Sequence, residues 1–359
     1  MQKEPIILSA FLILPFFSAC GQKTDAEPAA EESKAAAVKA ENIKVVMDPV
    51  FHSTNALING SDLEKLGFSF GDSVTLSFSN GLTLDDIPYH NGYYVRPNSP
   101  VAVAYPGLDG INLAFNLGEG SWNVWNLQNG YTVTITLKEK GRYLNEQETF
   151  AQSHSDDIKD YPDAETFENF RALSGGEIAP GVIYRSATMT NSTMNRADTV
   201  DDLAEQYGIR TILDFSDTEE SLAGFRAKDT WHSDYFDRLC DTGSVHVIGL
   251  GVNPASEEFH RDLSQALYRM IQGEGPYLFF CTEGKDRTGY AAAVIEALCG
   301  AGCDELLADY MKTCENYYGM TEETAPEQCR AAIETSFDPI MEIIFEVQEN
   351  EDLRTVPFE

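Results

Sequence analysis

The strongest constraint on the fold of this chain lies in the segment Cys281–Gly289, which reads Cys-Thr-Glu-Gly-Lys-Asp-Arg-Thr-Gly. An apolar run typical of a strand, residues 276–280, precedes it, and an alanine-rich run typical of a helix, residues 290–298, follows it. A strand, a tight loop and a helix in this order direct backbone N–H groups and a helix N-terminus toward an anion. With a thiol at the strand end and a guanidinium at the helix start, the segment predicts phosphoryl transfer through cysteine.

The residue types in this loop suit that chemistry. Cys281 would attack phosphorus as a thiolate, and the helix N-terminus, the loop N–H groups and Arg287 all favour its negative charge. Arg287 can also hold two phosphoryl oxygens at once. Gly284 and Gly289 allow the backbone to approach the anion closely. Thr288 can donate a hydrogen bond to the thiolate, so we predict catalytic roles for Cys281, Arg287 and Thr288.

The other residues of the loop, and one residue from a neighbouring strand, are expected to contact the substrate. Lys285 adds a positive charge at the rim, whereas Glu283 makes the rim less electropositive. Arg185 follows a predicted strand and should lie at the same edge of the sheet. The expected substrate-binding residues are Thr282, Glu283, Gly284, Lys285, Gly289 and Arg185.

Short apolar runs alternate with helical patterns from about residue 149 onward, which predicts an α/β domain over residues 149–350 with a central sheet flanked by helices. In residues 256–271 the expected buried face consists of Phe259, Leu263, Leu267 and Ile271. The site should lie where the strands have their carboxyl ends. Expected strands are 182–184, 211–213, 245–250 and 276–280, and expected helices are 195–207, 256–271, 290–298, 304–318 and 326–347.

An earlier domain, residues 43–148, has the pattern of a small all-β barrel or sandwich. Short alternating runs are separated by Asn-Gly and Asp-Gly pairs, which are hairpin signals. No catalytic group of residues stands out among them. Expected strands are 73–78, 93–95, 101–104, 111–115 and 132–137, and the turn pairs lie at 80–81, 91–92, 109–110 and 129–130.

The N-terminus has the anatomy of an export signal. Lys3 precedes an apolar run, residues 6–17, that is too short to span a bilayer. Phe17-Ser18-Ala19-Cys20 resembles a bacterial lipobox, in which the cysteine is lipidated. We therefore expect a signal peptide over residues 1–20, lipid on Cys20, and a solvated tether over residues 21–42. The alternative is an ordinary secretory signal, with the protein released rather than anchored to the outer face of the cell membrane.

The charge and the cysteines limit the possible partners. A formal net charge of −33 argues against nucleic acid and against electrostatic attraction to anionic lipid. We expect no cofactor and no metal, because a zinc site would lack both a Cys-x2-Cys pair and a neighbouring histidine. Buried thiols are the first expectation for the remaining cysteines, a disulfide is the second and zinc the third. These cysteines are Cys240, Cys299, Cys303, Cys314 and Cys329.

The loop resembles the signature of cysteine-dependent protein tyrosine phosphatases. Cys-x2-Gly-Lys-Asp-Arg-Thr-Gly is the form found in the bacterial branch of tyrosine and dual-specificity phosphatases, which includes secreted and lipid-anchored members. Residues 169–173, with Gly175-Gly176, resemble the Asn-Phe-Arg-Asp-Leu-Gly-Gly entry of that branch, and residues 179–186 resemble its strand ending in Arg-Ser. The resemblance covers residues 165–320. It implies the fold of these phosphatases and hydrolysis through a phosphocysteine.

Two positions depart from that pattern. Phe280 stands where the family usually has a histidine that supports the loop and the thiolate, so turnover is expected to be slower or its pH optimum higher. The run Asp214-Phe215-Ser216-Asp217 replaces Asp-Leu-Arg and lacks its arginine. By resemblance, Asp286 and Asp214 share the role of general acid. Each is equally explained by a structural role, with Asp214 capping a turn and Asp286 bonding loop N–H groups.

Three functional hypotheses follow. The leading one is an exported, lipid-anchored phosphatase that acts on phosphotyrosine proteins or small phosphomonoesters. The second keeps the reaction but takes phosphoinositides or inositol phosphates, which Lys285 favours and Glu283 opposes. The third is a weakly catalytic lipoprotein that binds a phosphate ligand, which Phe280 and the missing arginine motivate.

Overall fold

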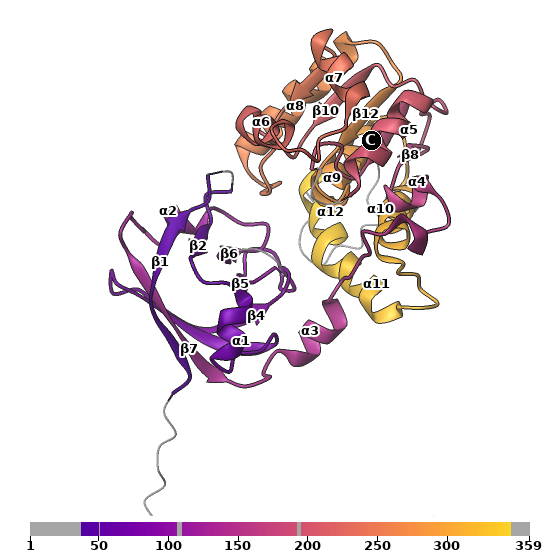
Figure 1. Ribbon diagram of the computed structural model, residues 1–359. Helices are drawn as coiled ribbons and strands as arrows, with labels where there is room; N and C mark the ends of the chain where they lie inside the picture. The colour runs from indigo at the N-terminus through magenta and orange to yellow at the C-terminus, as the bar shows by residue number, and fades with distance from the viewer. Residues whose placement is uncertain (1–36, 50, 106–109, 192–194, 346–359) are drawn as a thin grey trace, which may run out of the picture. The chain divides into compact units, whose positions relative to one another are not determined.

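The computed structural model describes residues 37–345 except 50, 106–109 and 192–194. The predicted signal peptide, the lipobox with Cys20 and most of the predicted tether therefore lie outside the described residues. Figure 1 shows a strand-rich N-terminal part and a later part with helices on both faces of a sheet. Within the described ranges, no helix combines the length and the apolar character needed to cross a membrane.

The N-terminal part is a closed barrel with the strand order β1-β2-β6-β5-β4-β3-β7. Val45, Val74, Leu113 and Val133 are among the side chains that fill its interior. The strands are β1 Lys39–Met47, β2 Thr54–Ala56, β3 Asp72–Phe78, β4 Thr83–His90, β5 Pro100–Val103, β6 Ile111–Phe115 and β7 Thr132–Glu139, with helices α1 Gly60–Lys65, α2 Ser121–Val124 and α3 Leu144–Phe150.

Four of the five strands expected in this part are present, and the fifth is not. Residues 93–95 belong to the connection between β4 and β5, and these two strands pair in parallel. A tight turn cannot join parallel strands, so Asn91-Gly92 is not the hairpin turn that we expected. The barrel also starts earlier than expected, because β1 begins at Lys39, inside the range assigned to the tether.

The later part has a five-stranded sheet with the order β11-β10-β12-β9-β8, parallel except for β8. Its strands are β8 Arg171–Ala172, β9 Ile183–Ser186, β10 Thr211–Asp214, β11 Val245–Val247 and β12 Tyr277–Phe280. Its helical segments are η1 Ile158–Asp160, α4 Ala164–Phe167, α5 Ala197–Gln206, α6 Glu219–Arg226, α7 Asp234–Asp241, α8 Glu257–Gln272, α9 Asp286–Leu298, α10 Cys303–Tyr318, α11 Pro326–Ala332, the π-helical η3 Ile333–Phe337 and α12 Asp338–Ile344.

The register of this sheet brings the ends of its central strands together. Phe280, the last residue of β12, lies opposite Ser186 of β9 and Asp214 of β10, and Asp214 lies opposite Val247 of β11. The segment Cys281–Gly289 therefore leaves the sheet at the edge where the other parallel strands also end. This is the location predicted from the sequence.

Helix α8 corrects one detail of the expected buried face. Ser256 caps the helix as its Oγ accepts a hydrogen bond from the N–H of Phe259. Met270 is 4% exposed, whereas Ile271 is 62% exposed. Each step of four residues advances about 40° beyond a full turn, so three such steps from Phe259 move Ile271 about 120° off the buried face. The position eleven residues on, Met270, returns to within about 20° of Phe259.

Only two of the five thiols are buried as expected, and Cys240, Cys299 and Cys303 are partly exposed. No disulfide joins Cys240, Cys299, Cys314 or Cys329, and Cys314 and Cys329 are buried. Burial raises the pKa of the Cys314 thiol to about 11, which keeps it protonated and unreactive near neutral pH. In the described ranges, no group of three or more His, Cys, Asp or Glu side chains is arranged to hold a metal ion.

Adjacent substitutions in α8 test the corrected face. We expect Met270→Ala to lower the free energy of unfolding by about 2–5 kcal/mol, because it leaves a cavity in the core. Ile271→Ala should change it by less than about 1 kcal/mol, because that side chain lies mainly in solvent. Urea unfolding followed by circular dichroism measures both values. Equal losses would contradict the assignment of the buried face.

Candidate active site

The segment Cys281–Gly289 joins a strand to a helix through a tight loop, as the sequence predicts. Cys281 follows the last residue of β12 and is 3% exposed, and α9 begins five residues later at Asp286. The first helical hydrogen bond of this segment runs from the N–H of Gly289 to the carbonyl of Lys285, 2.8 Å. Among the described residues, no acceptor receives a hydrogen bond from the backbone N–H groups of residues 282–288. These donors are therefore available to an anion.

Gly284 is required at its position for two separate reasons. Its φ angle is +71°, in the left-handed region that residues with a Cβ rarely adopt. A Cβ at this position would also stand 2.4 Å from the carbonyl oxygen of Ser186, at the end of β9. The loop therefore crosses the end of β9 in direct backbone contact, and the carbonyl of Thr282 accepts a further hydrogen bond from the N–H of Thr188.

Arg287 is held at the same edge of the sheet by three acceptors. Its Nη1 donates to the carbonyls of Phe215, 3.0 Å, and Leu250, 3.4 Å, and its Nη2 donates to Thr282 Oγ1, 3.1 Å. The guanidinium is thus oriented by residues that follow β10 and β11. Thr288, the next residue, is buried, and its hydroxyl has no partner among the described residues, so it is available for the predicted bond to a thiolate.

The two charged residues at the rim of the loop, Lys285 and Glu283, each have polar or charged partners. Lys285 Nζ lies 3.0 Å from Gln152 Oε1, 3.8 Å from Asp286 Oδ2 and 5.5 Å from the ring centroid of Tyr318. Burial alone would lower the pKa of Lys285, but nearby acidic groups, Asp286 foremost, raise it above its usual value. Glu283 accepts a hydrogen bond from the Tyr318 hydroxyl. Lys285 therefore stays charged but is already engaged by its neighbours.

The two candidate general acids lie in different settings. Asp286 opens α9, and its carboxyl is about half exposed at 44%. The surrounding protein removes water from the carboxyl of Asp286, which raises its pKa. The opposing charge of Lys285 does not cancel this effect, so the carboxyl keeps its proton to higher pH than usual. A partly exposed carboxyl group at the loop, with a raised pKa, is placed to protonate a leaving group.

Asp214 is fully buried and caps a turn. Its Oδ1 accepts hydrogen bonds from Ser216 N, 2.9 Å, Ser216 Oγ, 2.9 Å, and Asp217 N, 3.0 Å. Burial, followed by the neighbouring charge of Asp217, raises the pKa of Asp214 well above its usual value. These contacts correspond to the structural alternative for Asp214, since the turn it caps presents the Phe215 carbonyl to Arg287.

Arg185 differs from its predicted role. Its side chain has 0% exposure, and its Nη2 donates to the carbonyl of Gly284, 2.6 Å, while its Nη1 pairs with Asp309 of α10. The arginine therefore lies buried behind the loop, where its partners are protein groups. Sequence reasoning missed Asp309, because nothing in the local pattern of α10 marks it as the partner of a residue more than a hundred positions earlier.

A family model described as "Tyrosine phosphatase family" matches residues 162–351, just over half of the chain. A candidate tyrosine-protein phosphatase of Cupriavidus necator is 41% identical over 54 residues, which is 15% of this chain. The matched segment spans 20% of the length of that relative.

Among solved structures, the core catalytic domain of the PP-IP phosphatase Siw14 from S. cerevisiae, in complex with citrate, is 21% identical with a TM-score of 0.28, covering 46% of this chain and 85% of that one. The TpbA protein of P. aeruginosa is 17% identical with a TM-score of 0.26, covering 54% of this chain and 96% of that one. Scores this low carry no weight for the assignment, which depends on the family match.

The two carboxyl groups can be separated by their dependence on the leaving group. We expect Asp286→Asn to slow hydrolysis of phenyl phosphate by about 100-fold, and that of 2,4-dinitrophenyl phosphate much less, because only the poor leaving group needs a proton. The rate of the wild type on phenyl phosphate should fall as pH rises through the pKa of Asp286, and the variant should lose this dependence.

Asp214→Asn is the matched control, because an asparagine Oδ1 can accept the same turn hydrogen bonds. It should affect both substrates by the same factor. Kinetics with the two aryl phosphates across a pH series measure these effects. A leaving-group dependence that changes in Asp214→Asn but not in Asp286→Asn would reverse the assignment.

Proposed function

This chain belongs to the tyrosine phosphatase family as a cysteine-dependent phosphatase, and we propose that it hydrolyses phosphotyrosine-type monoesters through a phosphocysteine on Cys281. The observation that carries the proposal is the position of Cys281. It lies at the foot of a loop whose backbone N–H groups have no protein acceptor among the described residues and whose next helix begins with Asp286 and Arg287. A thiol in such a ring of donors is suited to attack a bound phosphoryl group.

In the first step, the Cys281 thiolate attacks phosphorus and the bond to the ester oxygen breaks. The electron pair leaves with that oxygen, which takes the proton of Asp286. Arg287 and the loop N–H groups hold the phosphoryl oxygens as their charge develops. The products of this step are a phosphocysteine, a phenol and an Asp286 carboxylate.

In the second step, water attacks the phosphocysteine and gives a proton to the Asp286 carboxylate. The bond between sulfur and phosphorus breaks, and inorganic phosphate is released. Thr288 donates a hydrogen bond to the departing thiolate, which stabilises its charge. The step restores both the thiolate and the carboxylic acid, so the cycle closes without any other reactant.

Several features favour a substrate with a single phosphate. Glu283 places a carboxylate beside the loop, and the chain carries a formal net charge of −33. Lys285, the residue that would contact a second phosphate, is engaged by Gln152 and Asp286. A phosphoinositide or inositol phosphate would have to displace these contacts and overcome the repulsion. A substrate panel at low and high salt distinguishes the two classes.

Phe280 bears on the hypothesis of a weakly catalytic binder. Its ring is fully buried in a cluster that includes Phe170, Ile212 and Leu278, so this position contributes packing and offers the loop no polar group. The remaining support for the thiolate comes from backbone donors, Arg287 and the hydroxyl of Thr288. We therefore propose a true enzyme with modest turnover, and a pre-steady-state burst without continued turnover would favour the binder.

The proposed nucleophile is tested by hydrolysis of p-nitrophenyl phosphate in a chelator. We expect activity to persist in EDTA, because Arg287 and the loop N–H groups neutralise the phosphoryl group in this mechanism. Cys281→Ser should lose at least about a thousandfold, because a serine hydroxyl in this site has no adjacent base. Activity retained by Cys281→Ser, or lost on adding EDTA, would contradict the mechanism.

We also propose that the chain is exported and anchored by lipid on Cys20, on the basis of the apolar run 6–17 and the lipobox-like segment that follows. In bacteria grown with a labelled fatty acid, the wild-type chain should take up label and sediment with membranes. Cys20→Ser should do neither, because the acceptor thiol is gone. A wild-type chain that is exported but carries no label would support the ordinary secretory signal instead.

A further inference from the structure

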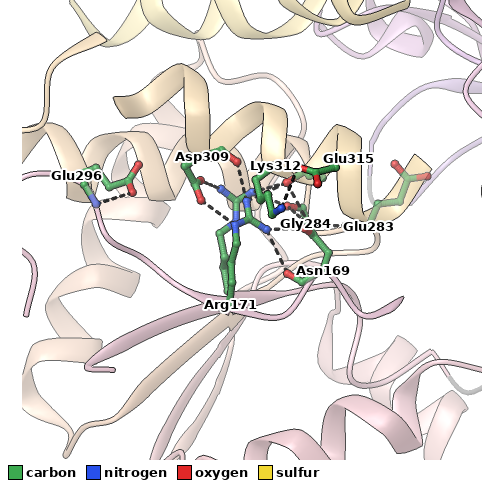
Figure 2. Close-up of polar contacts among 11 residues, drawn as sticks. Asn169, Arg171, Glu283, Gly284, Glu296, Asp309, Lys312 and Glu315 are labelled. Carbon is green, nitrogen blue, oxygen red and sulfur yellow. Dashed lines mark hydrogen bonds and ion pairs between the residues drawn. The ribbon is translucent and has the colours of Figure 1, made fainter. Parts of the chain in front are cut away.

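Two arginines share one carboxylate beneath the loop. Arg171 Nε donates to Asp309 Oδ1, 2.8 Å, and Arg185 pairs with Asp309 Oδ2. Arg171 Nη2 also donates to the backbone carbonyl of Asp309, 2.8 Å, and to Thr313 Oγ1, 3.1 Å. Figure 2 shows Arg171 and Asp309 meeting close to the backbone of Gly284. We call Arg171, Arg185 and Asp309 the arginine cluster.

Buried charges of this kind need compensation. Arg185 has no exposed side-chain surface, and Arg171 and Asp309 are only slightly exposed, at 14% and 13%. Burial would raise the pKa of Asp309, but its two arginine partners outweigh that effect and lower it, so the carboxylate stays ionised. A single carboxylate with a separate oxygen for each arginine fixes both guanidinium planes.

Of the two arginines, only Arg185 donates to the loop. Its Nη2 lies 2.6 Å from the carbonyl oxygen of Gly284. Asn169 Nδ2 approaches the carbonyls of Glu283 and Gly284 from the same region, at 3.5 Å each. Both carbonyls therefore turn toward the arginine cluster.

The direction of each of these carbonyls fixes the direction of the N–H group in the same peptide unit. A trans peptide unit holds its C=O and its N–H on opposite sides. When the Gly284 carbonyl points at Arg185, the N–H of Lys285 must point away from the cluster. The same argument applies to the Glu283 carbonyl and the N–H of Gly284. These are two of the loop N–H groups that have no protein acceptor among the described residues.

We propose that Arg185, fixed by Asp309, is a positioning residue that orients the Gly284–Lys285 peptide so that its N–H binds a phosphoryl oxygen. The proposal rests on the phosphatase function proposed above and deepens it. It also replaces the substrate contact expected for Arg185. Arg171 braces Asp309 and donates to Asn169 Oδ1, and Asn169 Nδ2 approaches the loop carbonyls. Arg171 therefore acts on the loop indirectly, whereas Arg185 donates to it directly.

Matched lysine variants of the two arginines separate positioning from stability. Arg185→Lys keeps a cation beside Asp309. Its single ammonium group cannot reproduce the two contacts that separate guanidinium nitrogens make with Asp309 and the Gly284 carbonyl. We expect it to weaken binding of tungstate, an oxyanion probe, and to lower kcat/KM for p-nitrophenyl phosphate, each by about tenfold or more. Arg171→Lys should lower both by a clearly smaller factor at a similar melting temperature, because Arg171 acts on the loop only through Asp309 and Asn169.

Tungstate binding separates a failure of the proposed function from a failure of the positioning role. Calorimetric titration with tungstate does not require turnover. A wild-type chain that binds tungstate but hydrolyses no substrate would therefore contradict the proposed function and leave the positioning role of Arg185 intact. Tungstate affinity unchanged in Arg185→Lys would overturn the positioning role alone, and so would equal losses in the two lysine variants.

If Arg185→Lys does not fold, a second variant tests the same positioning role. Asp309→Asn preserves the size of the side chain and weakens its hold on Arg185, so it should also weaken tungstate binding. The control is Asp156→Asn, which weakens a pair with the buried Arg196, an arginine that donates to no residue of the loop, and it should leave tungstate binding unchanged. Tungstate binding that stays at the wild-type level in folded Asp309→Asn would overturn the proposal.

Discussion

The orientation of the backbone N–H groups between Cys281 and Gly289 is the constraint on which the catalytic site depends. Several backbone N–H donors without a protein acceptor are costly, so the rest of the structure must hold them in place. The parallel register of β12 with β9 and β10 sets where the loop starts. Gly284 permits the close crossing over Ser186, and α9 supplies the donors of its first turn. A phosphoryl group then completes the hydrogen bonding that the fold leaves open.

Much of this arrangement could be predicted from the sequence, because its signals are local. The strand before Cys281, the helix after it and the strands that end near Arg185 and Asp214 are all present, although α9 begins at Asp286 rather than at 290. In the barrel, residues with clear alternation were identified. The strands β1, β2 and β4 lie outside the expected ranges, and in β4 the residues Asp85, Asp86 and Pro88 break the apolar pattern.

The role of Arg185 could not be predicted from local pattern. A guanidinium fits a carboxylate and a phosphate equally well, so an arginine at a strand end suggests a substrate contact. Only the fold shows that α10 brings Asp309 beneath the loop and draws the side chain away from the surface. Asp214 illustrates the same difficulty, because a carboxyl at a strand end can be an acid or a turn cap, and the turn hydrogen bonds made by its Oδ1 become visible only in the fold.

The central claim is that phosphate passes through Cys281. Rapid acid quenching of the reaction with p-nitrophenyl phosphate, followed by mass spectrometry of the peptides, tests it most directly. Our account predicts a phosphate group on the peptide that contains Cys281, formed within one turnover and lost as inorganic phosphate is released. Turnover without any modified Cys281, or phosphate found on another side chain, would contradict it.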